Sequence, residues 1–273
     1  MINASLVIYH NSKEDVNKLL DCVLSCPIDN LFIIDNSRND FYRTLECRSE
    51  KIRYIHNENI GYGASHNIAI RESIDMGAKY HVVLNPDVYF ENGTIETIAK
   101  YVDNYDDIGW VMPKVVYPDN SLQYLCKPLP TPMDLLLRRF FPKKWFAKSK
   151  ERFELRAFDY NHELNVPFLS GCFIFLRTSA LKDIGLFDER FFMYGEDIDF
   201  SRRMHQKYRT MYFPGATIIH AHKAESKTSR KMLLVHIKSI ITYFNKWGWF
   251  FDNERTRVNK NLSNALNKIC SNM

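Results

Sequence analysis

Three carboxylates crowd into four consecutive positions of this 273-residue chain. Residues 191–203 read Phe-Phe-Met-Tyr-Gly-Glu-Asp-Ile-Asp-Phe-Ser-Arg-Arg, so Glu196, Asp197 and Asp199 follow an aromatic cluster and Gly195. Because like charges repel, such a group beside bulky aromatics is typical of a base, a metal ligand or both. A structural explanation competes with this one, since acidic residues in the first turn of a helix that begins near Gly195 complement its dipole.

A second candidate site combines an acidic turn with histidines. Leu84-Asn-Pro-Asp87 ends a buried run, and its proline stiffens the turn that carries Asp87. One or two carboxylates with substrate phosphates are the usual ligands of Mg²⁺, whereas a plain strand-ending turn is the alternative. His220 and His222 lie on the same side of an extended chain, and one of them could join Asp87. An imidazole in the shell favours Mn²⁺ over Mg²⁺, although a lone histidine is more often a surface or packing residue.

A glycine motif, Asn59-Ile-Gly-Tyr-Gly-Ala-Ser-His-Asn67, lies between a predicted strand and a predicted helix. Its glycines permit close backbone approach to a ligand, and the helix start favours phosphate. The third glycine of a dinucleotide fingerprint would fall at His66, and the preceding strand is the third rather than the first, so that fingerprint fails. A simple turn and helix cap is the alternative.

Alternating strand and helix patterns place these motifs in the first half of the chain. Apolar runs predict strands over 6–9, 31–34, 52–55 and 80–84, with helices through 16–23 and over 64–76. This pattern predicts an α/β fold with a mostly parallel, doubly wound sheet. Ligands bind beyond the carboxyl ends of such strands, so we expect Asp35, Asn36 and Asp87 to face one crevice.

The second half has a weaker pattern. We expect a helix over 95–102, strands over 109–116, 168–176 and 217–219, and a long amphipathic helix over 228–250. Four prolines mark 126–165 as an irregular insertion. We expect two halves, 1–105 and 106–225, and a helical tail over 226–273; the resemblance described below implies nucleotide binding for the first half and catalysis for the second.

Composition limits the class of protein. A hydrophobic content of 45% supports a large core, and the net charge of +5 is mild. Basic and aromatic residues nevertheless cluster over 138–156, which suits an anionic surface. The six cysteines lack paired metal-ligand spacing, so we expect reduced thiols. No leader or membrane-spanning segment is evident, which predicts a cytoplasmic chain.

Taken in order, the motifs resemble family-2 glycosyltransferases, especially the bacterial rhamnosyltransferase-type branch. The resemblance implies a GT-A fold and a reaction that inverts the anomeric configuration. The resemblance covers about residues 4–226 and rests on Asp35-Asn36-Ser37, 59–67, 84–87, Gly171-Cys-Phe, Gly185-Leu-Phe-Asp-Glu189, 192–199, Arg203, Pro214 and His220. It implies a nucleotide-sugar site made of Asp35, Asn36, Asn59, Gly61, Asn67, Asn85, Asp87 and Arg203. Within this site, Asp35 would recognise the nucleobase.

The resemblance also implies catalytic roles. Asp87 and His220 would hold the divalent metal, Mn²⁺ or Mg²⁺, that bridges the diphosphate. Asp197 would be the catalytic base, with Glu196 and Asp199 shaping its field. Arg203 would balance their charge.

The implied reaction moves a sugar from a nucleoside-diphosphate sugar, dTDP-rhamnose or a UDP-sugar, to a hydroxyl of a glycan acceptor linked to polyprenyl diphosphate. The basic segment and the aromatic, cationic tail would then contact the anionic inner face of the membrane. A non-catalytic sugar-nucleotide or lipid-glycan binding module is one alternative. A nucleotidyltransferase is another, although Tyr9-His-Asn-Ser12 is not the glycine-rich loop it needs. Low net charge argues against a nucleic-acid partner.

Overall fold

The computed structural model describes residues 1–137, 147–221 and 230–271. Its strands are β1 (Ile2–Ile8), β2 (Asn30–Asp35), β3 (Ile52–His56), β4 (Tyr80–Leu84), β5 (Val88–Phe90), β6 (Ile108–Val116), β7 (Cys126–Lys127), β8 (Leu164–Asn165), β9 (Phe168–Leu169), β10 (Phe173–Arg177) and β11 (Arg209–His220). Its helices are α1 (Lys13–Leu24), η1 (Arg43–Arg48), α2 (Tyr62–Asp75), α3 (Thr94–Asp103), η2 (Met133–Leu137), α5 (Ala147–Phe153), α6 (Thr178–Ile184), α7 (Glu196–His205), α8 (Arg230–Trp247) and α9 (Asn253–Ser271). Residues 138–146 of the basic segment, and His222, lie outside the described residues.

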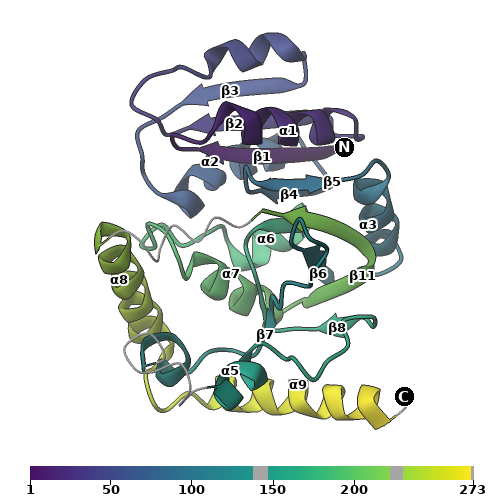
Figure 1. Ribbon diagram of the computed structural model, residues 1–273, viewed down its shortest axis with the longest axis vertical. Helices are drawn as coiled ribbons and strands as arrows, with labels where there is room; N and C mark the ends of the chain where they lie inside the picture. Colours follow the sequence, from purple (N-terminus) through teal and green to yellow (C-terminus); the bar gives the residue numbers. More distant parts are fainter. Residues whose placement is uncertain (138–146, 222–229, 272–273) are drawn as a thin grey trace.

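One large sheet organises the chain (Figure 1). Its strand order is β3-β2-β1-β4-β10-β6-β11-β5, and β8 pairs with β11. The first four strands run parallel, as do β6 and β11, whereas β10 and β5 run antiparallel to their neighbours. The prediction of an α/β fold with a mixed, mostly parallel sheet is confirmed.

Alternating side chains explain why helices cover both faces of the first strands. Val7 and Ile34 pack with Ala69 of α2, whereas Leu6 and Leu31 belong to the main core with α1. Successive residues of a strand point to opposite faces, so these apolar runs require cover on both sides. Figure 1 shows α1 in front of these strands and α2 behind them.

Several predicted elements were wrong in extent. The strand predicted over 217–219 is the final part of β11, which spans Arg209–His220 and contains a register shift between Phe213 and Thr217. The strand predicted over 168–176 divides into β9 and β10. Within 126–165, predicted to be irregular, the structure forms β7, η2, α5 and β8. The predicted helix over 228–250 ends at Trp247, and α9 follows as a second helix.

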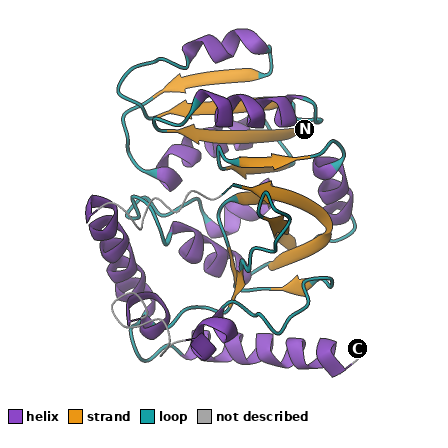
Figure 2. Cartoon of the chain, viewed as in Figure 1, coloured by secondary structure: helices purple, strands orange, loops and turns teal. Residues whose placement is uncertain are grey.

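The C-terminal helices pack against the rest of the chain (Figure 2). Ile240, Tyr243 and Phe244 of α8 form a second buried cluster with Phe191 and Ile198, which flank the start of α7. Leu262 of α9 belongs to the main core. In the described part of the chain, no helix combines the length and the hydropathy needed to cross a membrane.

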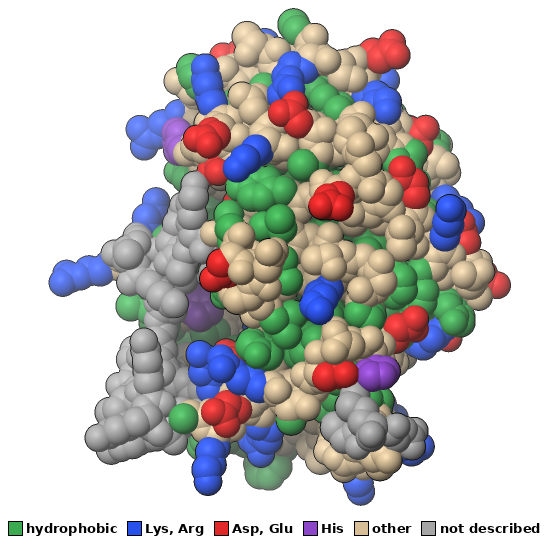
Figure 3. Space-filling model, turned by 45° about the vertical axis from the view of Figure 1, so that its right-hand side comes forward, with side chains coloured by type: hydrophobic (Ala, Val, Ile, Leu, Met, Phe, Trp, Pro, Cys, Tyr) green, Lys and Arg blue, Asp and Glu red, His purple; other side chains and the backbone are tan. Residues whose placement is uncertain are grey.

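The surface carries charges of both signs. On the face shown in Figure 3, basic and acidic side chains are interspersed among apolar areas. The described cysteines, which are Cys22, Cys26, Cys47, Cys126 and Cys172, are free thiols.

Candidate active site

The glycine motif touches the loop that precedes α7. The Tyr62 amide donates to the carbonyl of Phe192 over 2.8 Å. Gly61 has φ +102°, and a Cβ built on it would lie 2.4 Å from the Phe192 oxygen. Only glycine tolerates both this conformation and this approach. The hydrogen bond joins two motifs that are distant in the sequence, since Tyr62 and Phe192 are 130 positions apart.

The start of α7 places Asp197. Gly195 precedes the helix with φ +91°, and Tyr194 before it has φ +67°, an uncommon value for a residue with a side chain. The Asp197 carboxylate accepts hydrogen bonds from the amides of Gly171, over 3.2 Å, and Ile198, over 2.9 Å. A Cβ at position 171 would lie 3.1 Å from the Asp197 Cβ. The glycine therefore leaves room for the carboxylate.

Glu196 and Asp197 form an acidic pair with little neutralisation. Glu196 is only 6% exposed, and its Oε2 has no hydrogen-bond partner among the described residues. Burial, together with the charge of Asp197, raises the pKa of Glu196 to about 8. Burial also raises the pKa of Asp197, while Lys127 opposes that rise. A carboxylate with a raised pKa is a stronger proton acceptor.

Asp87 and His220 meet at the edge of the sheet. Asp87 Oδ1 lies 3.4 Å from His220 Nε2. His220 Nδ1 lies 3.0 Å from Gln123 Oε1, and the Gln123 amide donates to the His220 carbonyl over 2.7 Å. Burial lowers the pKa of His220, but Cys172 and Asp87 outweigh burial and raise it to about 10.

This pair fits a divalent metal ion as two of its ligands. A metal-binding imidazole is usually oriented by a partner on its other nitrogen, and Gln123 occupies that place. The described residues contain no group of three or more His, Cys, Asp or Glu side chains arranged for a metal. A site built from Asp87 and His220 would thus take its remaining ligands from substrate phosphates and water.

Tyr62 connects the turn that carries Asp87 with the acidic pair of Glu196 and Asp197. Its hydroxyl lies 2.8 Å from Asn85 Oδ1, in the turn that carries Asp87, and 3.0 Å from the carbonyl of Gly171, which holds Asp197. Burial raises the pKa of Tyr62, and Glu196 is the next contributor. Our sequence reasoning missed Tyr62 as a site residue, although its place between the two glycines of the 59–67 motif was a signal.

The other predicted nucleotide contacts lie near the ends of β2 and β3. Asp35 is buried and accepts from the hydroxyl of Tyr54, over 2.7 Å, and the amide of Ser37, over 2.9 Å. Asn36 donates to Ser65 Oγ over 2.7 Å, and its Oδ1 has no partner among the described residues. The remaining predicted contact in this region, Asn59, accepts from the Gly61 amide over 3.2 Å. Base recognition by Asp35 stays a prediction.

Three predicted residues serve contacts away from this arrangement. The Asn67 amide donates to the Phe187 carbonyl over 2.9 Å and accepts from the Phe187 amide over 3.0 Å. Asp199 is fully buried and pairs with Arg203 over 2.8 Å. The Arg203 guanidinium also donates to the Leu186 carbonyl over 2.7 Å. The structure therefore does not bring these three side chains to Tyr62.

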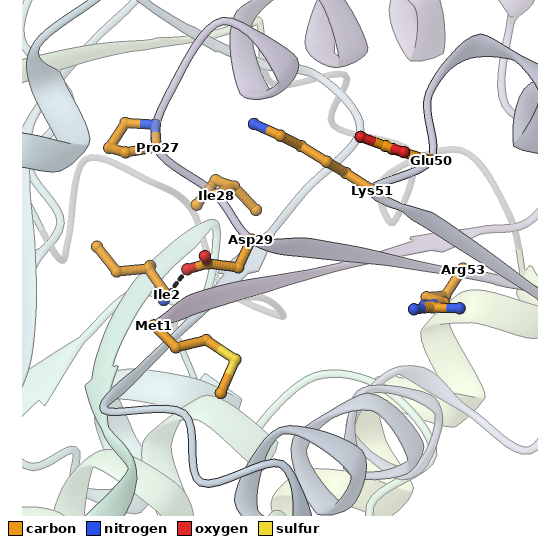
Figure 4. A pocket seen from close by; sticks show the side chains of 8 residues that line it. All are labelled: Met1, Ile2, Pro27, Ile28, Asp29, Glu50, Lys51 and Arg53. Carbon is orange, nitrogen blue, oxygen red and sulfur yellow. Dashed lines mark hydrogen bonds between the residues drawn. The ribbon is translucent and has the colours of Figure 1, made fainter.

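A groove lies at the amino ends of β1, β2 and β3, opposite the carboxyl ends that carry the predicted site residues. It is open and has a volume of about 810 Å³. Figure 4 shows its lining side chains, among which Asp29 accepts from the Ile2 amide over 2.7 Å. The charged side chains around it are Asp29, Glu50, Lys51 and Arg53. In parallel α/β sheets ligands bind at the carboxyl ends of the strands, so size alone does not make this groove the active site.

Comparison with known proteins agrees with this geometry. The family model described as "Glycosyltransferase like family 2" matches residues 34–234. The N-acetylglucosaminyl-diphospho-decaprenol L-rhamnosyltransferase of Mycobacterium tuberculosis is 30% identical over 211 residues, which are 70% of this chain and 66% of that protein. Rhamnosyltransferase WbbL of Escherichia coli is 23% identical over 246 residues, which are 87% of this chain and 90% of that protein.

A solved structure supports the fold. GalNAc-T7, crystallised with UDP, GalNAc and Mn²⁺, superposes with a TM-score of 0.67 at 12% identity, covering 90% of this chain and 48% of that chain. This likeness assigns the GT-A fold. The chain spans slightly less than two thirds of the M. tuberculosis relative. Because the family model covers the positions from Asp35 to His220, this chain belongs to glycosyltransferase family 2.

Proposed function

We propose that this chain is an inverting glycosyltransferase that moves a sugar from a nucleoside-diphosphate sugar to a hydroxyl of a glycan acceptor. The observation that carries the proposal is the position of Tyr62. Its hydroxyl bonds both to Asn85, beside the Asp87 turn, and to Gly171, whose amide holds Asp197. A single side chain thus links a pair suited to the diphosphate with a carboxylate suited to the acceptor.

Asp197 acts as the general base in this proposal. Its carboxylate accepts hydrogen bonds only from backbone amides in the contacts described above, and it remains partly exposed to solvent. The acceptor hydroxyl would lose its proton to this carboxylate late in the reaction, when the attacking oxygen has become acidic. Glu196, with its pKa of about 8, would hold a proton at neutral pH and so spare the pair a second negative charge.

Asp87 and His220 would hold the divalent metal ion, Mn²⁺ or Mg²⁺. A metal bound there would stabilise the negative charge that develops on the departing diphosphate. The Mn²⁺ in the GalNAc-T7 structure supports a divalent metal ion as the cofactor. Asp35, Asn36, Asn59 and Gly61 would contact the nucleoside, whereas we now assign structural roles to Asn67, Asp199 and Arg203 because of their contacts.

The donor class is testable by binding. The panel consists of UDP, dTDP and GDP, each titrated calorimetrically into the protein with and without Mn²⁺. We expect one nucleoside diphosphate to bind in a metal-dependent way and Asp87→Ala to weaken it at least tenfold. Asp106→Ala, which changes an exposed aspartate in the turn between α3 and β6, is the control. Absence of binding to all three nucleotides would instead favour a non-catalytic binding module.

A rhamnosyl donor is the more specific proposal. Both relatives named above are rhamnosyltransferases, which favours dTDP-rhamnose over a UDP-sugar. The name of the M. tuberculosis protein also specifies a diphospho-decaprenol acceptor, which favours a polyprenyl-diphosphate glycan. Radiolabelled transfer from dTDP-rhamnose and from UDP-sugars to such an acceptor would decide between the donors.

We further propose peripheral contact with the inner face of the membrane through the turn between α8 and α9. Phe250 is 78% exposed and Phe251 is 97% exposed. Two other aromatic residues of the tail hydrogen-bond within the chain, since the Trp247 indole donates to Asp199 and the Trp249 indole donates to Asn245. Cosedimentation with anionic vesicles should fall severalfold in a Phe250→Ser, Phe251→Ser variant and at high salt. Equal sedimentation of variant and wild type would contradict this contact.

A further inference from the structure

A cavity of about 390 Å³ lies where α5, α9 and the segment before η2 meet. Its volume falls in the range of small-molecule sites, about 300–1,000 Å³. Six of its twelve lining residues are apolar, and four of these, Leu129, Phe153, Leu155 and Leu262, are buried. Two cationic residues with exposed side chains, Arg152 and Lys260, also line it. Apolar walls beside positive charge suit an amphiphilic anion.

The wall of this cavity is fixed in place. The Asn259 side chain of α9 donates to the Leu129 carbonyl over 2.9 Å and accepts from the Leu129 amide over 2.8 Å. Asp134 is the carboxylate among the described lining residues, and its Oδ2 accepts from the amide of Thr131 over 2.9 Å and from its hydroxyl over 2.6 Å. These neutral donors hold the carboxylate in the wall, and the two cationic residues of the lining, Arg152 and Lys260, outnumber this one acidic residue.

Lys127 relates the cavity to the catalytic base. It directly precedes Pro128, which lines the cavity, and its Nζ lies 5.9 Å from the ring centroid of Phe153, another lining residue. On its other side, Lys127 Nζ lies 5.1 Å from the ring of Phe168 in β9, three residues before Gly171. The positive charge of Lys127 lowers the pKa of Asp197. The lysine thus lies between the cavity and the base.

We propose that this cavity binds the apolar chain of an isoprenoid diphosphate acceptor, with Lys127, Arg152 and Lys260 supplying positive charge for its diphosphate. This inference rests on the proposed function, because it gives the acceptor proposed there a binding place relative to Asp197. The cavity accommodates only the first part of a long chain. The remainder could continue into the membrane at the exposed Phe250–Phe251 turn, which immediately precedes α9.

Two neighbouring positions of α9 make a matched test. Ser263 lines the cavity, whereas Asn264 does not, and both are exposed helical residues. Farnesyl diphosphate is the probe, titrated calorimetrically into the full chain carrying Asp87→Ala, so that binding at the donor site is weakened. We expect Ser263→Trp to weaken binding at least tenfold and Asn264→Trp to leave it within twofold. Inorganic pyrophosphate and farnesol should each bind at least tenfold more weakly than farnesyl diphosphate.

Three results would overturn the inference. Equal binding by Ser263→Trp and Asn264→Trp would place the ligand elsewhere, and equal affinity for pyrophosphate would reduce the site to simple charge attraction. Adsorption of the protein to anionic vesicles without any binding of farnesyl diphosphate would identify a surface effect only. Transfer to a short, water-soluble glycan acceptor is measured in parallel with Asp87 intact. Absence of that transfer in the wild type would count against the proposed function. Equal transfer by the wild type and Ser263→Trp would show that the substitution affects lipid binding and not the transfer reaction.

Discussion

The two faces of α7 use the same kind of side chain in opposite ways. Asp197 and Asp199 are two residues apart, so they lie about 200° apart around the helix. Asp197 faces Gly171 and accepts from backbone amides. Asp199 faces the tail, where Lys246 lies 2.7 Å and the Trp247 indole nitrogen 2.8 Å from its Oδ1. One turn of helix thus holds one carboxylate bonded to backbone amides and another bonded to an indole and to cationic side chains.

The face of α7 that carries Asp199, the paired face, continues about one helical turn further, to Arg202. Arg202 is almost completely buried and bonds to Asp252 over 2.7 Å and to Glu254 over 2.7 Å. Its guanidinium also lies 4.1 Å from the ring of Trp247. Buried ions need partners of opposite charge, and the tail supplies them on this face of α7. The comparison teaches that the tail fixes the orientation of the helix that presents Asp197.

The largest effect should follow from a change on the catalytic face. Asp197→Asn keeps the side-chain volume and an oxygen for the Gly171 amide, but it removes the base. We expect kcat to fall by about 10³-fold, within the usual contribution of a general base. Nucleotide affinity, measured by calorimetry, should stay within threefold, and stability should not decrease. Turnover within tenfold of the wild type would remove Asp197 from the role of base.

The equivalent change on the paired face should damage stability instead. Asp199→Asn removes the buried carboxylate that Lys246 and Arg203 share, and Lys246 then keeps only its ion pair with Asp188 among the contacts described. Breaking a buried ion pair from one side costs about 3 kcal/mol. Urea denaturation should therefore show a clearly lower free energy of unfolding, while kcat of the folded enzyme stays within tenfold. A stability loss for Asp197→Asn that matched this one would break the distinction between the faces.

The pH dependence of Glu196→Gln sharpens the catalytic side of the comparison. The pKa of Glu196 rises from an ordinary value near 4.5 to about 8 in the folded chain. The folded state therefore retains a proton that the unfolded chain has lost, and stability falls as pH rises between these values. Glutamine removes this cost, so the variant should gain stability over the wild type by up to about 1.4 kcal/mol per pH unit in that interval. Denaturation at pH 5 and pH 8 measures the gain, and equal differences at both pH values would contradict it.

Part of this fold could be predicted from local sequence. The strand Tyr80–Leu84 was predicted with its correct bounds, because an apolar run ends at Asn85-Pro86. The predicted start of β11 was wrong because Pro214 and Gly215 resemble a strand break. In the structure they lie at the register shift inside the strand. A bulge is decided by pairing with β6, which local sequence does not specify.

The candidate site divides in the same way. The acidic cluster and the Asp87 turn are local patterns, so their residue types were predictable. The difference between Asp197 and Asp199 was not, because it depends on Lys246 and Trp247, almost 50 positions downstream. Similarly, Gln123 orients His220 from 97 positions away. Contacts with residues that are distant in the sequence leave no signature in a short motif, because only the folded chain brings these residues together.

The smallest effect tests a single contact of the paired face. Trp247→Phe retains an aromatic ring over Arg202 but removes the indole N–H that Asp199 accepts over 2.8 Å. A hydrogen bond to a charged group contributes about 1.5–3 kcal/mol, and Lys246 and Arg203 still neutralise Asp199, so we expect a loss near the lower limit. Trp249→Phe, whose indole bonds to Asn245 on an exposed surface, is the control and should lose less. If both variants unfold at the same urea concentration as the wild type, the indole contributes nothing to holding α7, and the ion pairs alone secure the helix that carries the base.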